Sequence, residues 1–175
     1  MNSMKELILG GARSGKSALA QQRAEQSGLS VTYIATARVL DEEMAARIAR
    51  HRQVRPAAWK LVEEPLALAR MLQANATADR CLLVDCLTLW LSNLLAENEA
   101  RLAIEKQALL ETLPTLPGHL ILVSNEVGQG IVPANPLARR FRDEAGWLHQ
   151  ALAPCCERVI LTVAGLPLTL KDITL

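Results

Sequence analysis

The residues from Gly10 to Ser17 have the types and the spacing that hold a chain of phosphates. They match the pattern G-x-x-x-x-G-K-S, directly after an apolar run and before an Ala-rich stretch. In such a loop, backbone N–H groups turn inward on the anion, and the following helix adds its positive N-terminal end. Lys16 would reach the β- and γ-phosphates, and the Ser17 hydroxyl would bind Mg²⁺. The pattern predicts a nucleoside triphosphate site, and an ordinary Gly-rich turn is the alternative.

Asp85 is the candidate for a second oxygen that holds the metal. It ends the apolar run Cys81–Val84. Proteins with a phosphate-binding loop place a carboxylate at the end of such a strand to hold the metal ion, here through water. A solvated carboxylate at a strand end is the alternative. We predict that Ser17 and Asp85 together hold Mg²⁺ beside the triphosphate.

His51 stands in a stretch rich in arginine. A helix is expected from Asp41, a suitable N-cap, to about Gln53, because Pro56 ends the stretch. A lone histidine on an apolar helix face is usually a buried structural residue. Here, however, four arginines lie around it within nine residues: Arg47, Arg50, Arg52 and Arg55. Nearby cations favour a neutral, nucleophilic imidazole and stabilise charge on a transferred group. His51 is therefore a candidate to attack an α-phosphate.

The other polar positions carry weaker predictions. His119 opens an apolar run and His149 lies beside an apolar helical stripe, so we interpret both as structural or surface residues. The polar, Gly-rich segment Ser124–Pro133 follows a strand and should border the ligand crevice. The arginines after it either contact a phosphate or a neighbouring subunit, or form a solvated helix face: Arg139, Arg140 and Arg142.

These residues need a scaffold in which strands and helices alternate. Short apolar runs predict strands at Leu7–Leu9, Val31–Ala35, Cys81–Val84, His119–Val123 and Val159–Val163, with an edge strand at Leu168–Lys171. Amphipathic stretches predict helices at Ser17–Gln26, Asp41–Gln53, Pro65–Ala74, Leu87–Leu113 and Pro136–Ala153. The alternation predicts an open α/β sheet, mostly parallel, with helices on both faces and ligands at the carboxyl ends of the strands. One domain accounts for residues 1–175.

The composition excludes several other classes of protein. Half of the 175 residues are hydrophobic, and 19 Lys+Arg against 18 Asp+Glu leave a net charge of +1. This excludes a disordered chain and a dedicated nucleic-acid binder, which needs a basic excess. Without an export signal or a run of 18 apolar residues, we expect a cytoplasmic protein with no membrane span. The four cysteines lack metal-ligand spacing and are expected to be reduced and mostly buried.

Taken together, these segments resemble the bifunctional adenosylcobinamide kinase/adenosylcobinamide-phosphate guanylyltransferase family of coenzyme B12 nucleotide-loop assembly. The resemblance covers nearly the whole chain. It rests on GGARSGKS (10–17), YIAT (33–36), DEEMAARIARHRQVRPAAW (41–59), VDCLTLWLSNLL (84–95), SNEVGQGIVP (124–133) and LARRFRD (137–143). It implies a RecA-like fold of the P-loop NTPase class and a homotrimer in which neighbouring subunits help to form the site.

The resemblance also implies roles for individual residues. His51 is the implied guanylylated nucleophile. The implied nucleotide-binding positions are Gly11, Ala12, Arg13, Ser14, Gly15, Lys16, Ser17, Ala18, Thr36, Ala37, Arg38, Arg52, Gln53, Val54, Arg55, Glu63 and Asp85.

The leading hypothesis is therefore a bifunctional enzyme. It would phosphorylate adenosylcobinamide with ATP or GTP, with Lys16 as a catalytic residue and Mg²⁺ as cofactor. It would then transfer GMP from GTP through His51 to give adenosylcobinamide-GDP. The alternatives are a simple P-loop small-molecule kinase and a non-enzymatic nucleotide-dependent switch. The arginines around His51 favour the bifunctional enzyme, because neither alternative needs a nucleophilic histidine.

Overall fold

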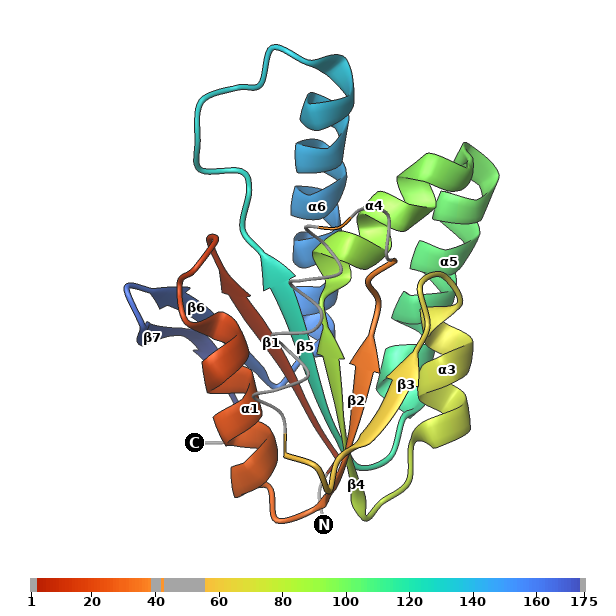
Figure 1. Cartoon of the computed structure of the whole chain (residues 1–175), viewed down its shortest axis with the longest axis vertical. Coiled ribbons are helices and arrows are strands. Elements are labelled where there is room, and N and C mark those ends of the chain that lie inside the picture. The colour runs from red at the N-terminus through yellow and green to blue at the C-terminus, as the bar shows by residue number, and fades with distance from the viewer. Residues whose placement is uncertain (1–2, 39–41, 43–55, 174–175) are drawn as a thin grey trace.

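A seven-stranded sheet forms the centre of the structure (Figure 1). The computed structural model describes residues 3–38, 42 and 56–173. Its strands are β1 (Met4–Gly10), β2 (Ser30–Ala35), β3 (Lys60–Glu63), β4 (Arg80–Asp85), β5 (His119–Asn125), β6 (Arg158–Val163) and β7 (Leu166–Asp172). They lie in the order β3-β2-β4-β5-β1-β6-β7, and among these described strands β7 alone is antiparallel to its neighbour. The predicted, mostly parallel α/β fold is confirmed.

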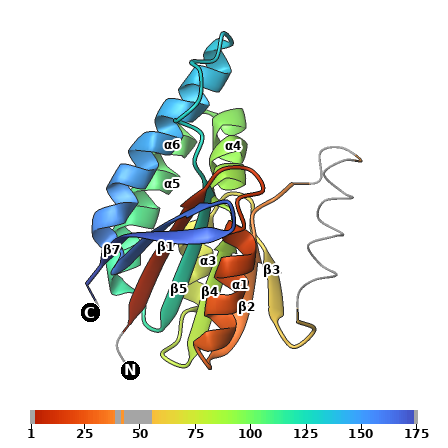
Figure 2. The same cartoon turned by 90° about the vertical axis from the view of Figure 1, so that its left-hand side faces the viewer.

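Helices cover both faces of the sheet, as predicted (Figure 2). One face carries α1 (Lys16–Gln26), which packs on β1, β4 and β5. The other face carries α3 (Leu68–Asn75), α4 (Leu87–Glu97), α5 (Glu99–Thr112) and α6 (Pro136–Cys155). A short 3₁₀ turn, η1 (Leu113–Thr115), follows α5. The carboxyl ends of the parallel strands therefore meet at one edge, beside the start of α1.

Small side chains set the position of α1 on its face. Ala20 and Ala24 are four residues apart and buried against Ile8 of β1. Residues at this spacing share one helix face, and their size allows the helix to approach the sheet closely. The opposite core is built mainly from leucines around the fully buried Trp90. The close packing of α1 fixes the loop that precedes it.

One predicted helix is two helices in the structure. The apolar pattern from Leu87 to Leu113 predicts a continuous helix, but the chain breaks at Asn98, between α4 and α5. The Asn98 side chain accepts a hydrogen bond from the Arg101 backbone at 2.9 Å and so caps α5. The pattern continues across the break because both helices pack on the same core, through Leu94 and Leu102. The single-helix prediction was therefore wrong.

The edge strands also differ from the sequence-based expectations. β3 was not predicted, because its four residues lie at the edge of the sheet and three of them are exposed. The predicted edge strand Leu168–Lys171 is confirmed and is longer, as β7. The helix predicted for Asp41–Gln53 lies outside the described residues, apart from Glu42, and stays a prediction.

The cysteines are free thiols, as expected. Cys81, Cys86 and Cys156 are buried, and Cys155 is half-buried. Burial raises the pKa of Cys81 and of Cys156 to about 12, so both thiols are protonated at neutral pH. None of the helices in the described part of the chain has the length and apolar character to cross a membrane.

Candidate active site

The loop from Gly10 to Ser17 joins β1 to α1 and has the backbone of an anion-binding loop. Arg13 and Gly15 adopt left-handed conformations, with φ of 56° and 95°. These residues turn the chain back on itself so that it enters the helix. Gly10 has no room for a side chain, because a Cβ there would stand 2.8 Å from the Thr162 carbonyl oxygen. The context predicted for a phosphate-binding loop, strand before and helix after, is confirmed.

Lys16 lies inside this loop. Lys16 is only 8% exposed, and its ammonium group donates a hydrogen bond to the Gly11 carbonyl oxygen at 3.2 Å. Ser17 follows in the first turn of α1 and is half-buried. A cation held within the loop, next to the positive end of a helix, is suited to a polyphosphate.

The alternation of the strands brings further polar side chains to the same place. Tyr33, Asp85, Asn125 and Thr162 lie on the face covered by α1, towards the carboxyl ends of β2, β4, β5 and β6. The Tyr33 hydroxyl donates to Asp85 Oδ2 at 3.1 Å and so orients the predicted metal-holding carboxylate.

The donor set fits magnesium rather than a transition metal. Ser17 and Asp85 supply a hydroxyl and a carboxylate, which are hard oxygen ligands. Within the described residues, no group of three or more His, Cys, Asp or Glu could hold a metal ion. Mg²⁺ is commonly bound by few protein oxygens together with phosphate and water oxygens. The residues present therefore fit an ion that arrives with a nucleotide.

Buried polar atoms without a hydrogen-bond partner gather around the same loop. In the described part of the chain there are four: Ser14 Oγ, Arg101 Nε, Asn125 Oδ1 and Thr162 Oγ1. Ser14, Asn125 and Thr162 all belong to the loop or to the strand ends beside it. Because buried polar groups in proteins are almost always hydrogen-bonded, their concentration here indicates a ligand-binding site.

The second part of the implied nucleotide-binding set lies further along the carboxyl edge. Thr36 is fully buried, and its hydroxyl donates to the Cys86 carbonyl oxygen at 2.7 Å and accepts from the Cys86 N–H at 3.1 Å. These bonds tie the end of β2 to the end of β4. Ala37 is half-buried, and Arg38 pairs with Glu97 at 3.0 Å. A nucleotide contact from these residues stays a prediction.

Glu63 lies furthest from the loop. It is the exposed last residue of β3. β3 is four strand spacings from β1, which is roughly 19 Å at about 4.8 Å per strand. The structure therefore brings the loop and Asp85 together and leaves Glu63 on the other half of the same edge. A nucleotide bound in the loop would have to extend across β5, β4 and β2 to reach it.

The remaining candidates of the basic segment lie outside the described residues. These are His51, Arg52, Gln53, Val54 and Arg55. The predicted roles of these residues are not tested by the described geometry. The arginines at the start of α6 tie parts of this chain together: Arg139 donates to the Pro133 and Ala134 carbonyl oxygens, while Arg140 and Arg142 pair with Glu99 and Asp143.

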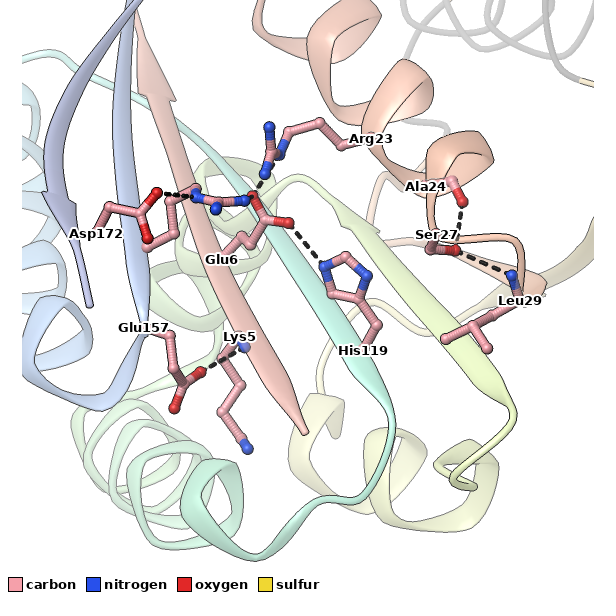
Figure 3. Close-up of polar contacts among 10 residues, drawn as sticks. Lys5, Glu6, Arg23, Ala24, Ser27, Leu29, His119, Glu157 and Asp172 are labelled. Carbon is pink, nitrogen blue, oxygen red and sulfur yellow. Dashed lines mark hydrogen bonds and ion pairs between the residues drawn. The ribbon is translucent and has the colours of Figure 1, made fainter. Parts of the chain in front are cut away.

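The other two histidines, interpreted from the sequence as structural or surface residues, both have hydrogen-bonding partners within the fold. His149 is 7% exposed and is hydrogen-bonded to Ser124 Oγ at 2.7 Å. Burial lowers the pKa of His149, and the nearby Glu126 carboxylate opposes that shift. His119 Nε2 lies 2.7 Å from Glu6 Oε1 at the amino end of the sheet (Figure 3).

Tyr33 and Thr162 did not enter the sequence-based set, and Asn125 entered it only as part of the segment Ser124–Pro133, which was expected to border the ligand crevice. Asn125 carried the clearest signal, as a polar residue at the end of an apolar run. Its place beside Gly10 depends on the order of the strands, which the sequence does not contain. Tyr33 stands in a segment that carries the resemblance and Thr162 in a predicted strand, but neither residue type has a fixed role in a phosphate site.

The loop, the buried lysine and the carboxylate two strands away define a nucleotide-binding protein of the P-loop class. Solved structures have the same fold. The superposition with the RadB recombinase structure has a TM-score of 0.54 at 19% sequence identity, and it covers 90% of this chain and 73% of the recombinase chain. The superposition with the Pyrococcus horikoshii protein PH0250 has a TM-score of 0.57 at 9% sequence identity, and it covers 97% of this chain and 87% of the PH0250 chain.

The sequence comparisons identify the family. The family model described as "Cobinamide kinase / cobinamide phosphate guanyltransferase" matches residues 6–170. The "Bifunctional adenosylcobalamin biosynthesis protein CobP" of Pseudomonas aeruginosa is 63% identical over 169 residues, which cover 96% of this chain and 98% of that protein. The corresponding Escherichia coli protein, CobU, is 40% identical over 182 residues, which cover 96% of this chain and 100% of that protein. The chain belongs to the cobinamide kinase/cobinamide phosphate guanyltransferase family, which confirms the predicted family and enzyme class.

Proposed function

We propose that this chain phosphorylates adenosylcobinamide with ATP or GTP and then transfers GMP from GTP to the adenosylcobinamide phosphate. The product is adenosylcobinamide-GDP, an intermediate of cobalamin biosynthesis. The observation that carries the proposal is the Gly10–Ser17 loop, with Lys16 inside it and Asp85 beside it, in a chain of this family.

In the first reaction, the residues around the loop bind the triphosphate and stabilise its charge. The substrate hydroxyl oxygen attacks the γ-phosphorus, the bond to the β–γ bridging oxygen breaks, and the hydroxyl proton passes to solvent. Lys16 and the first N–H groups of α1 stabilise the negative charge on the phosphoryl oxygens. Ser17 and Asp85 would hold Mg²⁺, which withdraws charge from the β- and γ-phosphate oxygens when bound.

In the second reaction, His51 is the nucleophile. Its ring nitrogen attacks the α-phosphorus of GTP, an N–P bond forms, and pyrophosphate leaves. A phosphate oxygen of adenosylcobinamide phosphate then attacks the same phosphorus and releases the histidine. The covalent step splits one difficult displacement into two easier ones. Support comes from the sequence, where arginines surround His51, and Arg52, Gln53, Val54 and Arg55 would contact the nucleotide.

We also propose that Thr36, Ala37, Arg38 and Glu63 contact the guanine nucleotide, since all four lie at the carboxyl edge of the sheet. We propose a homotrimer that acts in the cytoplasm. Support for association is the exposed apolar surface of β7 and its flanks, where side chains are between 55% and 71% exposed: Val163, Leu166, Leu168, Leu170 and Ile173.

A two-stage reaction tests the proposal. The purified full-length chain is incubated with adenosylcobinamide, Mg²⁺ and ATP, then supplied with GTP, and the corrinoid is analysed by mass spectrometry after each stage. We expect one added phosphate after the first stage and one added GMP after the second. Phosphorylation without GMP addition would favour a simple kinase. Nucleotide hydrolysis with neither product would favour a nucleotide-dependent switch.

A further inference from the structure

Asn125 occupies the position between the phosphate loop and the metal-holding carboxylate. It is the last residue of β5, which lies between β1 and β4. In the register of the sheet it stands beside Gly10, where the loop begins, and two residues beyond Val123, the partner of Asp85. Ile121 and Val123 belong to the core beneath α1, so Asn125 lies on the same face as the loop.

The backbone on both sides of this residue is fixed. The Asn125 N–H donates to Thr88 Oγ1 at 2.9 Å, and the Thr88 hydroxyl donates to Cys86 Sγ at 3.3 Å. The next N–H along the chain, that of Glu126, donates to the Gly10 carbonyl oxygen at 2.9 Å. Asn125 is thereby held at a set position relative to the strand of the loop and the strand of Asp85.

Its side chain, in contrast, is not satisfied. Asn125 Oδ1 is buried and has no hydrogen-bond partner among the described residues. A buried acceptor without a partner destabilises the folded state, so such atoms are rare outside functional sites. A carboxamide carries an acceptor and two N–H donors on one rigid group. Phosphoryl oxygens need donors, and an attacking hydroxyl needs an acceptor.

We propose that Asn125 is a further catalytic residue of the phosphoryl-transfer step. Its Nδ2 donates to an oxygen of the transferred phosphoryl group, and its Oδ1 accepts the hydrogen bond of the attacking hydroxyl. The carboxamide stays neutral and exchanges no proton, so its contribution is alignment of the two reacting groups. This inference rests on the kinase step of the proposed function.

The neutrality of asparagine suits this position. The site already has to accommodate the negative charge of a triphosphate, and a carboxylate in the same place would repel it. An aspartate would also lose both donors while it is ionised. It would regain one donor when protonated, which gives the inference a signature in the pH profile.

The test compares the full-length wild-type chain with Asn125→Ala, Asn125→Asp and the matched control Asn98→Ala. Asn98 is an exposed helix cap far along the chain from the loop. For each protein we would measure the kcat of adenosylcobinamide phosphorylation, the Kd of ATP by calorimetry, and the thermal midpoint. Asn125→Ala should lower kcat at least about 100-fold, as for other lost transition-state donors. Its ATP Kd should change less than about threefold, because the loss is specific to the transition state.

The aspartate variant distinguishes a catalytic role of Asn125 from a purely structural one. Asn125→Asp should be strongly impaired at pH 8, and its activity relative to wild type should rise as the pH falls towards 5.5. The control should retain kcat within about twofold, since a cap affects stability rather than chemistry. A normal kcat in Asn125→Ala, or a loss that follows the ATP Kd or the thermal midpoint, would overturn the assignment. A wild-type chain without kinase activity would overturn the proposed function instead.

Discussion

The two ends of the face that α1 covers hold polar side chains in opposite situations. At the amino end, Glu6 is 1% exposed, and its carboxylate contacts Arg23 and His119 (Figure 3). Arg158 shares the same carboxylate. At the carboxyl end, buried oxygen atoms of Ser14, Asn125 and Thr162 have no partner among the described residues. Charges that neutralise one another stabilise the fold, whereas unsatisfied polar atoms are available to a ligand.

A single helix connects these two ends. α1 begins with Lys16 in the phosphate loop, and Arg23, two turns later, reaches Glu6. Ala20 and Ala24 of the same helix pack against the sheet. The same face is therefore divided into an end whose ion pairs stabilise the protein and an end that we propose binds the nucleotide. Substitutions at the two ends should separate stability from activity.

The largest effect is expected from Lys16→Ala at the carboxyl end. Both activities should fall at least about 100-fold, because each needs a triphosphate whose charge this lysine neutralises. Phosphorylation and GMP transfer would be assayed separately, with urea unfolding as the check on stability. Lys106→Ala, which removes a lysine that pairs with Glu144 on the opposite face, is the matched control. Near-normal turnover in Lys16→Ala would contradict the P-loop assignment.

At the amino end, Glu6→Gln should destabilise the fold while leaving catalysis intact. Arg23, His119 and Arg158 would lose their shared carboxylate, and their side chains are only 22%, 13% and 18% exposed. The expected loss in the free energy of unfolding is about 2 kcal/mol, below the full penalty for a buried pair because water still reaches these groups. Urea unfolding measures this loss, and Glu25→Gln on the exposed side of α1 is the control. A loss of kcat without a loss of stability would contradict the assignment of a stabilising role to the amino end.

Asp85→Asn tests the carboxylate that we propose holds the metal. Turnover at limiting Mg²⁺ should fall at least about tenfold, a typical loss when a residue that positions a metal is removed. The measurement is a titration of kinase activity with Mg²⁺. Asp79→Asn, an exposed aspartate just before the same strand, should titrate like wild type. An unchanged Mg²⁺ dependence in Asp85→Asn would make this carboxylate a solvated strand end.

Tyr33→Phe should give the smallest effect, through Asp85. It removes only the hydroxyl that donates to Asp85 Oδ2 at 3.1 Å. The Mg²⁺ concentration for half-maximal activity should rise about threefold, consistent with one modest hydrogen bond. In the Asp85→Asn background the same substitution should have little further effect, because the two residues act through one contact. Fully additive losses would show that Tyr33 acts elsewhere.

The sequence predicted the parts of this site that are local. The loop, Lys16, Ser17 and Asp85 could be found because each is defined by residue types within one strand–loop–helix unit. The individual role of Asn125 and the Glu6 cluster could not, because they depend on how separate segments pack: Glu6 and His119 are 113 residues apart, and Glu6 and Arg23 are 17 apart. Glu6 stands directly before the apolar run Leu7–Leu9, where its own residue type gives no local signal of burial.

The fold shows the same limit. The parallel strands of the core were predicted because they are continuous apolar runs, whereas β3 is short and exposed. The break at Asn98 was missed because both helices bury leucines in one core, so the apolar periodicity continues through the cap. The apolar pattern of a sequence therefore predicts which segments share a core more reliably than it predicts where a helix ends.

Covalent capture of GMP tests the proposed function most directly. The wild-type chain incubated with α-labelled GTP should become labelled and release pyrophosphate, and the label should be lost in acid and kept in base, as for a phosphoramidate. His51→Ala should not become labelled, whereas His149→Asn, which keeps a hydrogen-bonding group beside Ser124, should be labelled like wild type. Full labelling of His51→Ala, or a wild type that phosphorylates adenosylcobinamide without ever becoming labelled, would contradict transfer of GMP through His51.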